Sequence, residues 1–297
     1  MSKIHQALRK AEKEGRNESL NNSRDRKSSL AEIKQEILKN HLLEPAGSIS
    51  LKTEGFGITE TARMKLHTIE LNIGANSKLV AQFDSKSVPS EHYRALKTKV
   101  LQFHESRGFK TLLVTSSGMS EGKTMTATNL ALTMAKEINI RVLLVDGDLR
   151  RPAVHKILGF SYETGFADYL SGHIAMEEIV LATQIPNFSV VPAGKIPDNP
   201  VELLNSQRMR SFLTYVTDKF DWIIFDSPPV AAMADSEILS TVTDGVLLVV
   251  RALVTPSDML AKSIEALKGK NILGVVLNGF EDDKAKKYSY YYQQSGS

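Results

Sequence analysis

The sequence contains no cysteine, which excludes disulfide bonds, thiolate nucleophiles and zinc or iron–sulfur sites held by cysteine. Long hydrophobic runs are also missing. No stretch approaches the roughly 20 apolar residues that a membrane-spanning helix needs, and the charged N-terminus lacks the apolar core of a signal peptide. Because 42% of the 297 residues are nevertheless hydrophobic, we expect a cytoplasmic protein with a sizeable globular core.

A large excess of either charge is absent as well. The chain has 37 Lys and Arg against 34 Asp and Glu, a formal net charge of +3. Residues 1–40 hold ten basic and six acidic side chains, so the rest of the chain is slightly negative. A nucleic-acid-binding domain would carry a basic face, and we therefore expect no nucleic-acid partner.

The composition changes along the chain and divides it into three parts. Apolar residues at helical spacing in residues 1–17, and a capping box at Ser29 and Glu32, predict two helices within an N-terminal helical arm, residues 1–80. The last residues are polar and tyrosine-rich and lack a packing pattern, which predicts a flexible tail over 282–297. The main domain is expected at 81–281.

Short apolar runs alternate with helical patterns throughout the main domain. Runs of this kind are typical of parallel strands that helices cover on both faces. Strands are predicted at 111–115, 142–145, 188–191, 222–225, 246–250 and 273–277, and helices from Pro89 and near 123–137, 200–219, 235–241 and 257–268. The pattern predicts an α/β fold with a doubly wound, mostly parallel sheet of P-loop NTPase topology, in which ligands bind at the carboxyl ends of the strands.

A phosphate-binding loop, Ser117–Thr124, follows the first of these strands and opens a helix. It matches the pattern GxxxxGK[ST], except that Ser117 replaces the first glycine. Backbone N–H groups of such a loop bind phosphate oxygens, the lysine reaches the β and γ phosphates, and the Thr124 hydroxyl is suited to Mg²⁺. The residues expected to bind ATP here are Ser117, Gly118, Met119, Ser120, Glu121, Gly122, Lys123, Thr124 and Met125.

Three acidic residues follow two other predicted strands. Asp146 and Asp148 end the run that begins at Val142, and Asp226 ends the run Ile223–Phe225. A single aspartate there would most simply cap a helix. Three acids at matching strand ends beside a phosphate loop instead favour a magnesium–nucleotide site, with Thr124, Asp146 and Asp226 as the expected metal-binding residues.

Taken together, these motifs resemble the bacterial protein tyrosine kinases (BY-kinases) of polysaccharide export systems. The resemblance covers about residues 80–297 and includes the phosphate loop, the run with the pattern DxDxR that ends at Arg150, and the acidic strand ending at Asp226. Further similar segments are Glu91–Lys97, Asn199–Leu204 and the tyrosine cluster Tyr288, Tyr290, Tyr291 and Tyr292.

The resemblance implies ATP-dependent autophosphorylation of the tyrosine cluster, in trans between subunits, in the control of exopolysaccharide polymerisation and export. Lys123, Asp146, Asp148 and Asp226 would be the catalytic residues, with Asp146 taking or orienting the tyrosine proton. Arg150 would bind phosphate, or alternatively form a surface ion pair. Glu91, Arg94 and Lys97 would mediate assembly into a ring of identical subunits, although an intrahelical ion pair would also explain the presence of the first two.

The resemblance also implies partner proteins, and two positions of this sequence differ from the family pattern. The resemblance implies a separate membrane adaptor of the polysaccharide co-polymerase type, which would recruit the protein to the inner face of the plasma membrane, and a tyrosine phosphatase. Ser120 stands where the family usually has glycine, and Lys97 replaces an arginine, losing bidentate pairing. Two alternatives remain: a nucleotide-switch ATPase of the partitioning type, whose additional loop lysine would fall at Gly118, and an ATP-binding regulator without kinase activity.

Overall fold

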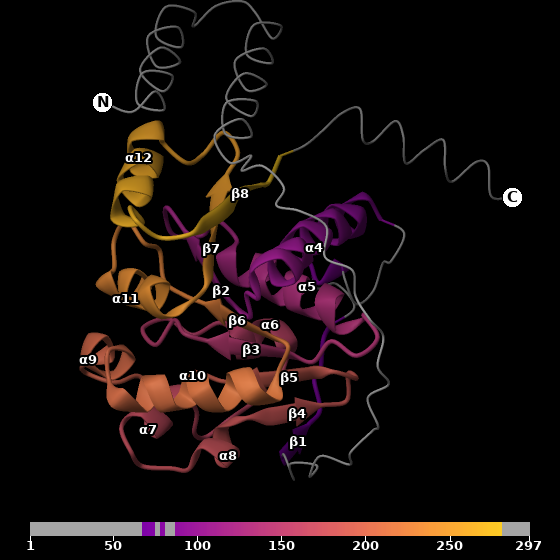
Figure 1. The fold of residues 1–297 in the computed structure, drawn as a ribbon, viewed down its shortest axis with the longest axis vertical. Helices are drawn as coiled ribbons and strands as arrows, with labels where there is room; N and C mark the ends of the chain where they lie inside the picture. The colour runs from indigo at the N-terminus through magenta and orange to yellow at the C-terminus, as the bar shows by residue number, and fades with distance from the viewer. Residues whose placement is uncertain (1–66, 75–77, 81–86, 281–297) are drawn as a thin grey trace, which may run out of the picture. The chain divides into compact units, whose positions relative to one another are not determined.

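The computed structural model describes residues 67–74, 78–80 and 87–280 (Figure 1). The chain divides into two compact units, Met1–Met64 and Lys65–Ser297, and every described residue belongs to the second. The predicted arm helices and the tyrosine cluster lie outside the described residues. Within the described ranges, no helix is both long and apolar enough to span a bilayer.

An eight-stranded sheet forms the centre of the described part. Its strand order is β1-β4-β5-β3-β6-β2-β7-β8, and every neighbouring pair is parallel except β4 and β5. The bounds are β1 His67–Ile69, β2 Thr111–Ser116, β3 Val142–Asp146, β4 Leu181–Thr183, β5 Phe188–Val191, β6 Trp222–Asp226, β7 Gly245–Arg251 and β8 Ile272–Asn278. This confirms the mostly parallel α/β sheet and all six predicted strands.

Two strands were not predicted. Both β1 and β4 have three residues, and neither contains a fully buried position, so they lack the continuous apolar run that marks the central strands. They pair with each other in parallel, and β4 joins the sheet antiparallel to β5. The sheet therefore includes residues that precede position 81, where the sequence pattern places the start of the main domain.

Nine helices lie within the described ranges. They are α4 Val88–Arg107, α5 Lys123–Ala135, α6 Val154–Leu158, α7 Phe166–Leu170, α8 Met176–Ile179, α9 Pro200–Leu204, α10 Gln207–Lys219, α11 Ala234–Val242 and α12 Ser257–Ala266. The helix predicted at 200–219 is two helices, because the hydroxyl of Ser206 accepts a hydrogen bond from Met209 N (3.2 Å) and caps a new helix. Helices α6 to α8 have four or five residues, too few to show a helical period.

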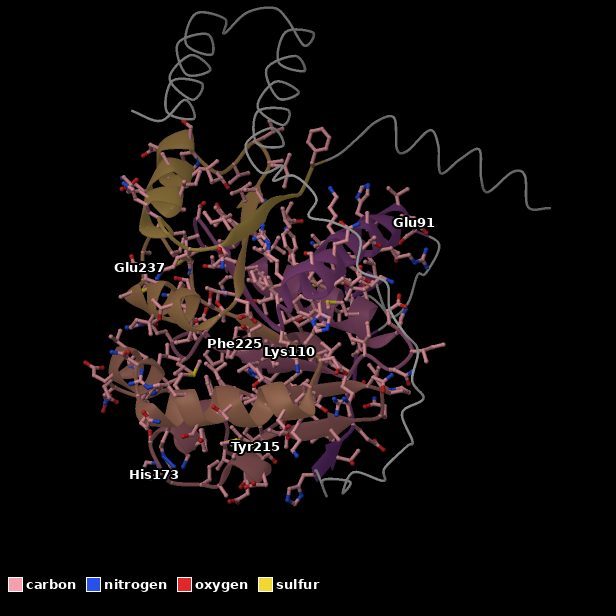
Figure 2. The ribbon with its side chains drawn as sticks, viewed as in Figure 1. Glu91, Lys110, His173, Tyr215, Phe225 and Glu237 are labelled. Carbon is pink, nitrogen blue, oxygen red and sulfur yellow. The ribbon has the colours of Figure 1, made fainter. Side chains whose placement is uncertain are left out.

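Both faces of the sheet are buried, as a doubly wound fold requires. Alternate residues of β2 point to opposite faces, and Leu112 and Val114 pack into a core with the buried face of α5. On the other face, Phe225 packs against Phe166 and Phe212, with ring centroids 6.4 Å away in both cases. Phe225 is labelled at the centre of the molecule in Figure 2.

The strand order determines where the motifs meet. Strand β6 lies between β2, which leads into the phosphate loop, and β3, which leads into the double-acid motif. Asp146 and Asp226 are direct register partners at the carboxyl ends of β3 and β6. The three segments that carry the phosphate loop and the acids therefore converge at one edge of the sheet.

Candidate active site

Side chains that follow β7 or end β8 hold the phosphate loop in shape. Gly122 has φ = +92°, and a Cβ atom there would lie 2.0 Å from Asn278 Nδ2, so only glycine fits this position. Asn278, at the end of β8, donates from Nδ2 to the carbonyl of Glu121 at 2.8 Å. Thr255 donates to the buried Glu121 carboxylate at 2.5 Å. These contacts fix the turn that precedes α5.

Ser120 has a backbone conformation that normally favours glycine. Its φ is +60°, in the left-handed region. Residues with a Cβ pay roughly 1–2 kcal/mol there. The loop therefore keeps the path that a glycine would allow at this position, and Ser120 adopts it at an energetic cost.

Lys123 begins α5 and points at the acids. Its Nζ donates to Asp148 Oδ2 at 2.9 Å and lies 3.3 Å from Thr124 Oγ1 and 3.7 Å from Asp226 Oδ1. Burial lowers the pKa of Lys123, but the carboxylates of Asp226 and Asp148 outweigh that effect and raise its pKa above the ordinary value. The ammonium group is therefore charged, and it lies beside the carboxylates of Asp148 and Asp226, which are expected to lie near the phosphates of a bound nucleotide.

Asp146 is fully buried and only partly satisfied. Its Oδ2 accepts hydrogen bonds from the backbone N–H groups of Ala153 and Val154, both at 3.1 Å, at the start of α6. One oxygen thus does cap a helix. The other, Oδ1, is buried without a hydrogen-bond partner in the described part of the chain. Burial raises the pKa of Asp146, and the nearby negative charge of Asp226 raises it further.

Asp226 is also completely buried. Neither of its carboxylate oxygens accepts a hydrogen bond of normal geometry from any described residue. Burial raises its pKa, while the charge of Lys123 and the hydroxyl of Thr124 act in the opposite direction. Buried polar atoms without partners are costly, so these oxygens mark a place where a bound group would supply the missing contacts.

Asp148 joins the two motifs. Beside its bond to Lys123, its Oδ1 accepts from the backbone N–H of Arg151 at 3.0 Å. The backbone N–H of Gly147, between the two acids, donates to the carbonyl of Asp226 at 2.8 Å. A Cβ at position 147 would lie 2.8 Å from that carbonyl oxygen. The glycine therefore lets the double-acid motif lie directly against the end of β6.

Arg150 forms an ion pair. Its Nε and Nη2 donate to the two carboxylate oxygens of Asp235 at 2.7 and 3.1 Å. Asp235 is fully buried in the first turn of α11, whereas the Arg150 side chain is 41% exposed. The bidentate bonds and charge of Asp235 raise the pKa of Arg150. Arg150 therefore forms an ion pair, but because Asp235 is buried, the pair differs from the surface ion pair considered in the sequence.

The remaining loop residues differ in their surroundings. Ser117 is buried, and its Oγ lacks a partner within the described ranges. Thr124 is buried beside Lys123, whereas the Met119 side chain is largely exposed and lies 3.6 Å from Arg151 Nη1. The side chain of Met125, the last residue of the expected nucleotide-binding set, packs against the hydrophobic core.

The helix expected to mediate assembly is α4, where Glu91 is labelled in Figure 2. Glu91 and Arg94 form an intrahelical ion pair. Lys97 pairs with Glu137, which follows α5, and its side chain is only 15% exposed. The three residues therefore make contacts within one chain, and Lys97 differs from the other two in being mostly covered.

The site contains no ready-made metal cage. In the described ranges, no group of three or more His, Asp or Glu side chains could hold a metal ion unaided. Mg²⁺ commonly binds through one or two carboxylates, phosphates and waters rather than an all-protein cage. The unpartnered oxygens of Asp146 and Asp226, near Thr124 and Lys123, fit a group of that kind.

Sequence reasoning missed three residues that shape this site. Asp235, Thr255 and Asn278 lie 85, 134 and 157 positions from their partners Arg150 and Glu121. None belongs to a recognised motif. Asn278 alone carried a usable signal, because a polar residue at the carboxyl end of a parallel strand faces the ligand edge.

Comparisons with known proteins agree with this geometry. The family described as the AAA domain matches residues 115–269. The tyrosine-protein kinase YwqD of Bacillus subtilis is 37% identical over 216 residues, which cover 72% of this chain and 90% of the relative. The solved kinase domain of the Escherichia coli tyrosine kinase ETK is 30% identical, with a TM-score of 0.65, over 69% of this chain and 81% of that one.

A further solved structure, the chimerical protein CapA2B2, is 29% identical with a TM-score of 0.66, over 71% of this chain and 96% of that one. Both the identity to YwqD and the extent of its coverage exceed what a shared fold alone would give. With the phosphate loop, the double-acid motif and the acidic strand converging as described, the chain belongs to the bacterial tyrosine-protein kinases and is an enzyme of that class.

Proposed function

We propose that this kinase transfers the γ-phosphoryl group of ATP to its own C-terminal tyrosines, Tyr288, Tyr290, Tyr291 and Tyr292, between subunits. The observation that carries the proposal is the convergence of Lys123, Asp146 and Asp226 beside a phosphate loop, with buried carboxylate oxygens that lack hydrogen-bond partners among the described residues. Such transfers depend mainly on positioning and on stabilisation of charge.

Nucleotide binding is assigned to residues 117–125 together with Arg150. Backbone N–H groups of the loop and the N-terminus of α5 would bind the phosphate oxygens. Thr124, Asp146 and Asp226 would hold Mg²⁺, directly or through water. When bound, Mg²⁺ would neutralise the negative charge of the phosphates.

Each catalytic side chain then has a distinct task. Lys123 is charged and mostly covered, so it can neutralise charge that develops between the β and γ phosphates. Asp146 is our candidate for the group that accepts or orients the tyrosine proton, because burial raises its pKa toward the range useful for a base. Asp148 assists by holding Lys123 in place.

Assembly and partners complete the proposal. Glu91, Arg94 and Lys97 on α4 would contribute to contacts between identical subunits that close a ring. By the family resemblance, the enzyme regulates exopolysaccharide polymerisation and export, and an adaptor recruits it to the inner face of the plasma membrane. A tyrosine phosphatase reverses its phosphorylation. Several phosphotyrosines, each adding about −1.5 to −2 charges, would repel and loosen the assembly.

Incubation with Mg²⁺ and ATP, followed by detection of phosphotyrosine, tests the proposal. We expect signal in the full chain, none in Lys123→Ala, and none when the four tail tyrosines are changed to phenylalanine. ATP hydrolysis without phosphotyrosine would refute the kinase proposal and favour a nucleotide switch. Bound ATP with neither reaction would favour a regulator without transfer activity.

A further inference from the structure

The carboxylate of Asp235 is bonded to the double-acid motif without being part of any motif itself. Asp235 stands in the first turn of α11, where an acidic side chain interacts favourably with the helix N-terminus. Its side chain has no exposed surface, and both of its oxygens accept from the guanidinium of Arg150. Carboxylates are rarely buried this completely unless a partner compensates the charge. The pair is therefore a specific contact of the fold.

The geometry of the pair fixes the orientation of Arg150. Asp235 accepts from Nε at 2.7 Å and from Nη2 at 3.1 Å, so it holds one edge of the planar guanidinium. A guanidinium has five N–H donors, and these bonds use two of them. The other three make no hydrogen bond to the described residues, and the side chain is 41% exposed. Arg150 is thus held at one edge and can bind a ligand with the other.

Arg150 lies close to the proposed phosphate site. The hydrogen bond to Asp235 is the main cause that raises the pKa of Arg150, and the charges of Asp235 and then Asp148 raise it further. Asp148 also accepts from Lys123 Nζ at 2.9 Å and from the backbone N–H of Arg151 at 3.0 Å. Two cations, one from the phosphate loop and one from the double-acid motif, are therefore near the same carboxylate.

Helix α11 is itself tied to the segment that follows Asp226. The hydroxyl of Ser236, the residue after Asp235, donates to the carbonyl of Pro228 at 2.5 Å. It also lies 3.1 Å from the hydroxyl of Ser227, which directly follows Asp226. The first turn of α11 therefore connects the end of β6 to the double-acid motif, and this connection gives Asp235 a defined place beside the site.

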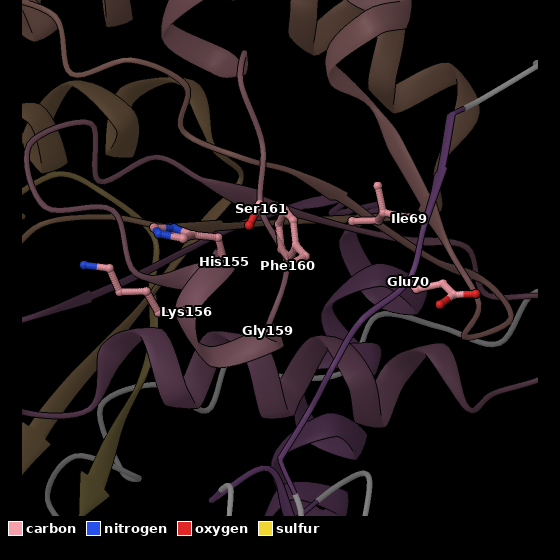
Figure 3. A pocket seen from close by; sticks show the side chains of 7 residues that line it. All are labelled: Ile69, Glu70, His155, Lys156, Gly159, Phe160 and Ser161. Carbon is pink, nitrogen blue, oxygen red and sulfur yellow. The ribbon is translucent and has the colours of Figure 1, made fainter.

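A hollow beside α6 is separate from this arrangement. It measures about 540 Å³, with His155 and Lys156 at one end and Ile69 and Glu70 at the other (Figure 3). The ion pair of α11 and the double-acid motif does not line it. A ligand in that hollow would therefore not account for the free donors of the arginine, whereas a phosphate group at the carboxyl ends of β3 and β6 would.

We propose that Asp235 is a positioning residue, which holds the Arg150 guanidinium so that its free donors bind the terminal phosphate of ATP. The inference rests on the proposed nucleotide site and adds to it a residue that no motif includes. Guanidinium groups bind phosphate oxygens through parallel N–H donors, which requires a fixed orientation. Without Asp235, Arg150 would keep its charge but lose that orientation, because a free arginine side chain has many rotamers.

Binding of two nucleotides to the full-length protein separates positioning from structural support. Titration calorimetry with Mg²⁺ gives the Kd for ADP and for a β,γ-imido analogue of ATP, which carries the terminal phosphate. In Asp235→Asn we expect the Kd of the analogue to rise about tenfold, the effect of losing a hydrogen bond between charged groups. The Kd for ADP should stay within about twofold. Arg150→Lys keeps a cation beside the buried carboxylate but lacks the planar fork, and it should give the same result.

A double variant and a matched control complete the test. Because Asp235 acts through Arg150, adding Asp235→Asn to Arg150→Ala should raise the Kd of the analogue no further. The control is Asp221→Asn. Asp221 holds Arg141 by two side-chain bonds of 3.1 and 3.2 Å just before the same two strands, β6 and β3, begin. Its substitution should leave both Kd values unchanged.

Three outcomes would contradict the inference. An unchanged Kd of the analogue in Asp235→Asn would overturn it. An equal loss for both nucleotides, or a further loss in the double variant, would also overturn it, because Asp235 would then support the fold of the site and not the orientation of Arg150. If the unsubstituted protein binds neither nucleotide, the proposed nucleotide site itself is refuted, and this inference with it.

Discussion

Removing Arg150 should destabilise the protein more than removing its partner, although only one charge is lost in each case. Asp235 has no exposed surface and accepts both hydrogen bonds of the pair, at 2.7 and 3.1 Å, whereas Arg150 is 41% exposed. In Arg150→Met the carboxylate would stay buried without a partner. In Asp235→Asn the guanidinium could still be hydrated, and the amide would keep the shape of the side chain.

The expected magnitude follows from that asymmetry. Breaking a buried ion pair so that one charge is left uncompensated costs roughly 3–5 kcal/mol. Because Arg150 is partly solvated, we expect the lower end, about 3 kcal/mol, for Arg150→Met. A loss of that size lowers the melting temperature by roughly 6–12 °C in a domain of this size. Asp235→Asn should cost about 1.5–2 kcal/mol, at the lower end of the roughly 1.5–3 kcal/mol that a hydrogen bond to a charged group contributes.

Thermal and urea unfolding without nucleotide measure these free energies, and the double variant supplies the control. Arg150→Met with Asp235→Asn should recover at least about 1.5 kcal/mol relative to Arg150→Met alone, since the unpaired buried charge is then gone. Additive losses, or a larger cost for Asp235→Asn than for Arg150→Met, would contradict the reasoning. Either result would mean that the arginine is not the main partner of the buried carboxylate.

Three further outcomes are expected. Ser120→Gly should raise the melting temperature by about 2–4 °C, because it relieves roughly 1 kcal/mol of strain from the left-handed backbone conformation. Ser120→Ala keeps the Cβ and should not raise it. A lower melting temperature for the glycine variant would argue against the strain. Because burial and Asp226 raise the pKa of Asp146, the folded state binds more protons than the unfolded state above about pH 4, and stability should fall as pH rises toward the raised value. Asp146→Asn should therefore stabilise the nucleotide-free protein more at pH 8 than at pH 5, as calorimetry at both values would reveal, and an equal effect would contradict this. Asn278→Ala should remove the hydrogen bond to the Glu121 carbonyl and weaken ATP binding measured by titration calorimetry. Asn271→Ala, which removes a side-chain hydrogen bond just before β8 begins, serves as its control.

The central sheet and its ligand edge could be predicted because they depend on local patterns. The strands β2, β3 and β6 are continuous apolar runs, and Lys123, Asp146 and Asp226 each follow one of them. Parallel strands place their carboxyl ends together, so spacing in the sequence was enough to expect convergence. The strand order that puts β6 between the other two confirmed that expectation.

The unpredicted parts depend on contacts between distant segments. No local pattern indicates that Arg150 pairs with Asp235, or that Lys97 reaches Glu137, because each partner is an ordinary residue of another helix or loop. The same holds for β1 and β4, which are strands only because each pairs with a neighbour. The packing of the Met125 side chain against the hydrophobic core is likewise not indicated by the loop motif.

The support that Asn278 gives to the phosphate loop has a consequence for synthesis on the ribosome. Asn278 donates to a carbonyl 157 residues earlier, and β8 is the last strand along the described part of the chain. Loop closure over such a separation is slow and late in folding. A nascent chain that has exposed its phosphate loop but not β8 lacks this hydrogen bond, so ATP binding is expected to mature only after β8 has been made. The phosphate loop would then gain its full support only after β8 has been made, and the tyrosines proposed as acceptors follow β8 in the sequence.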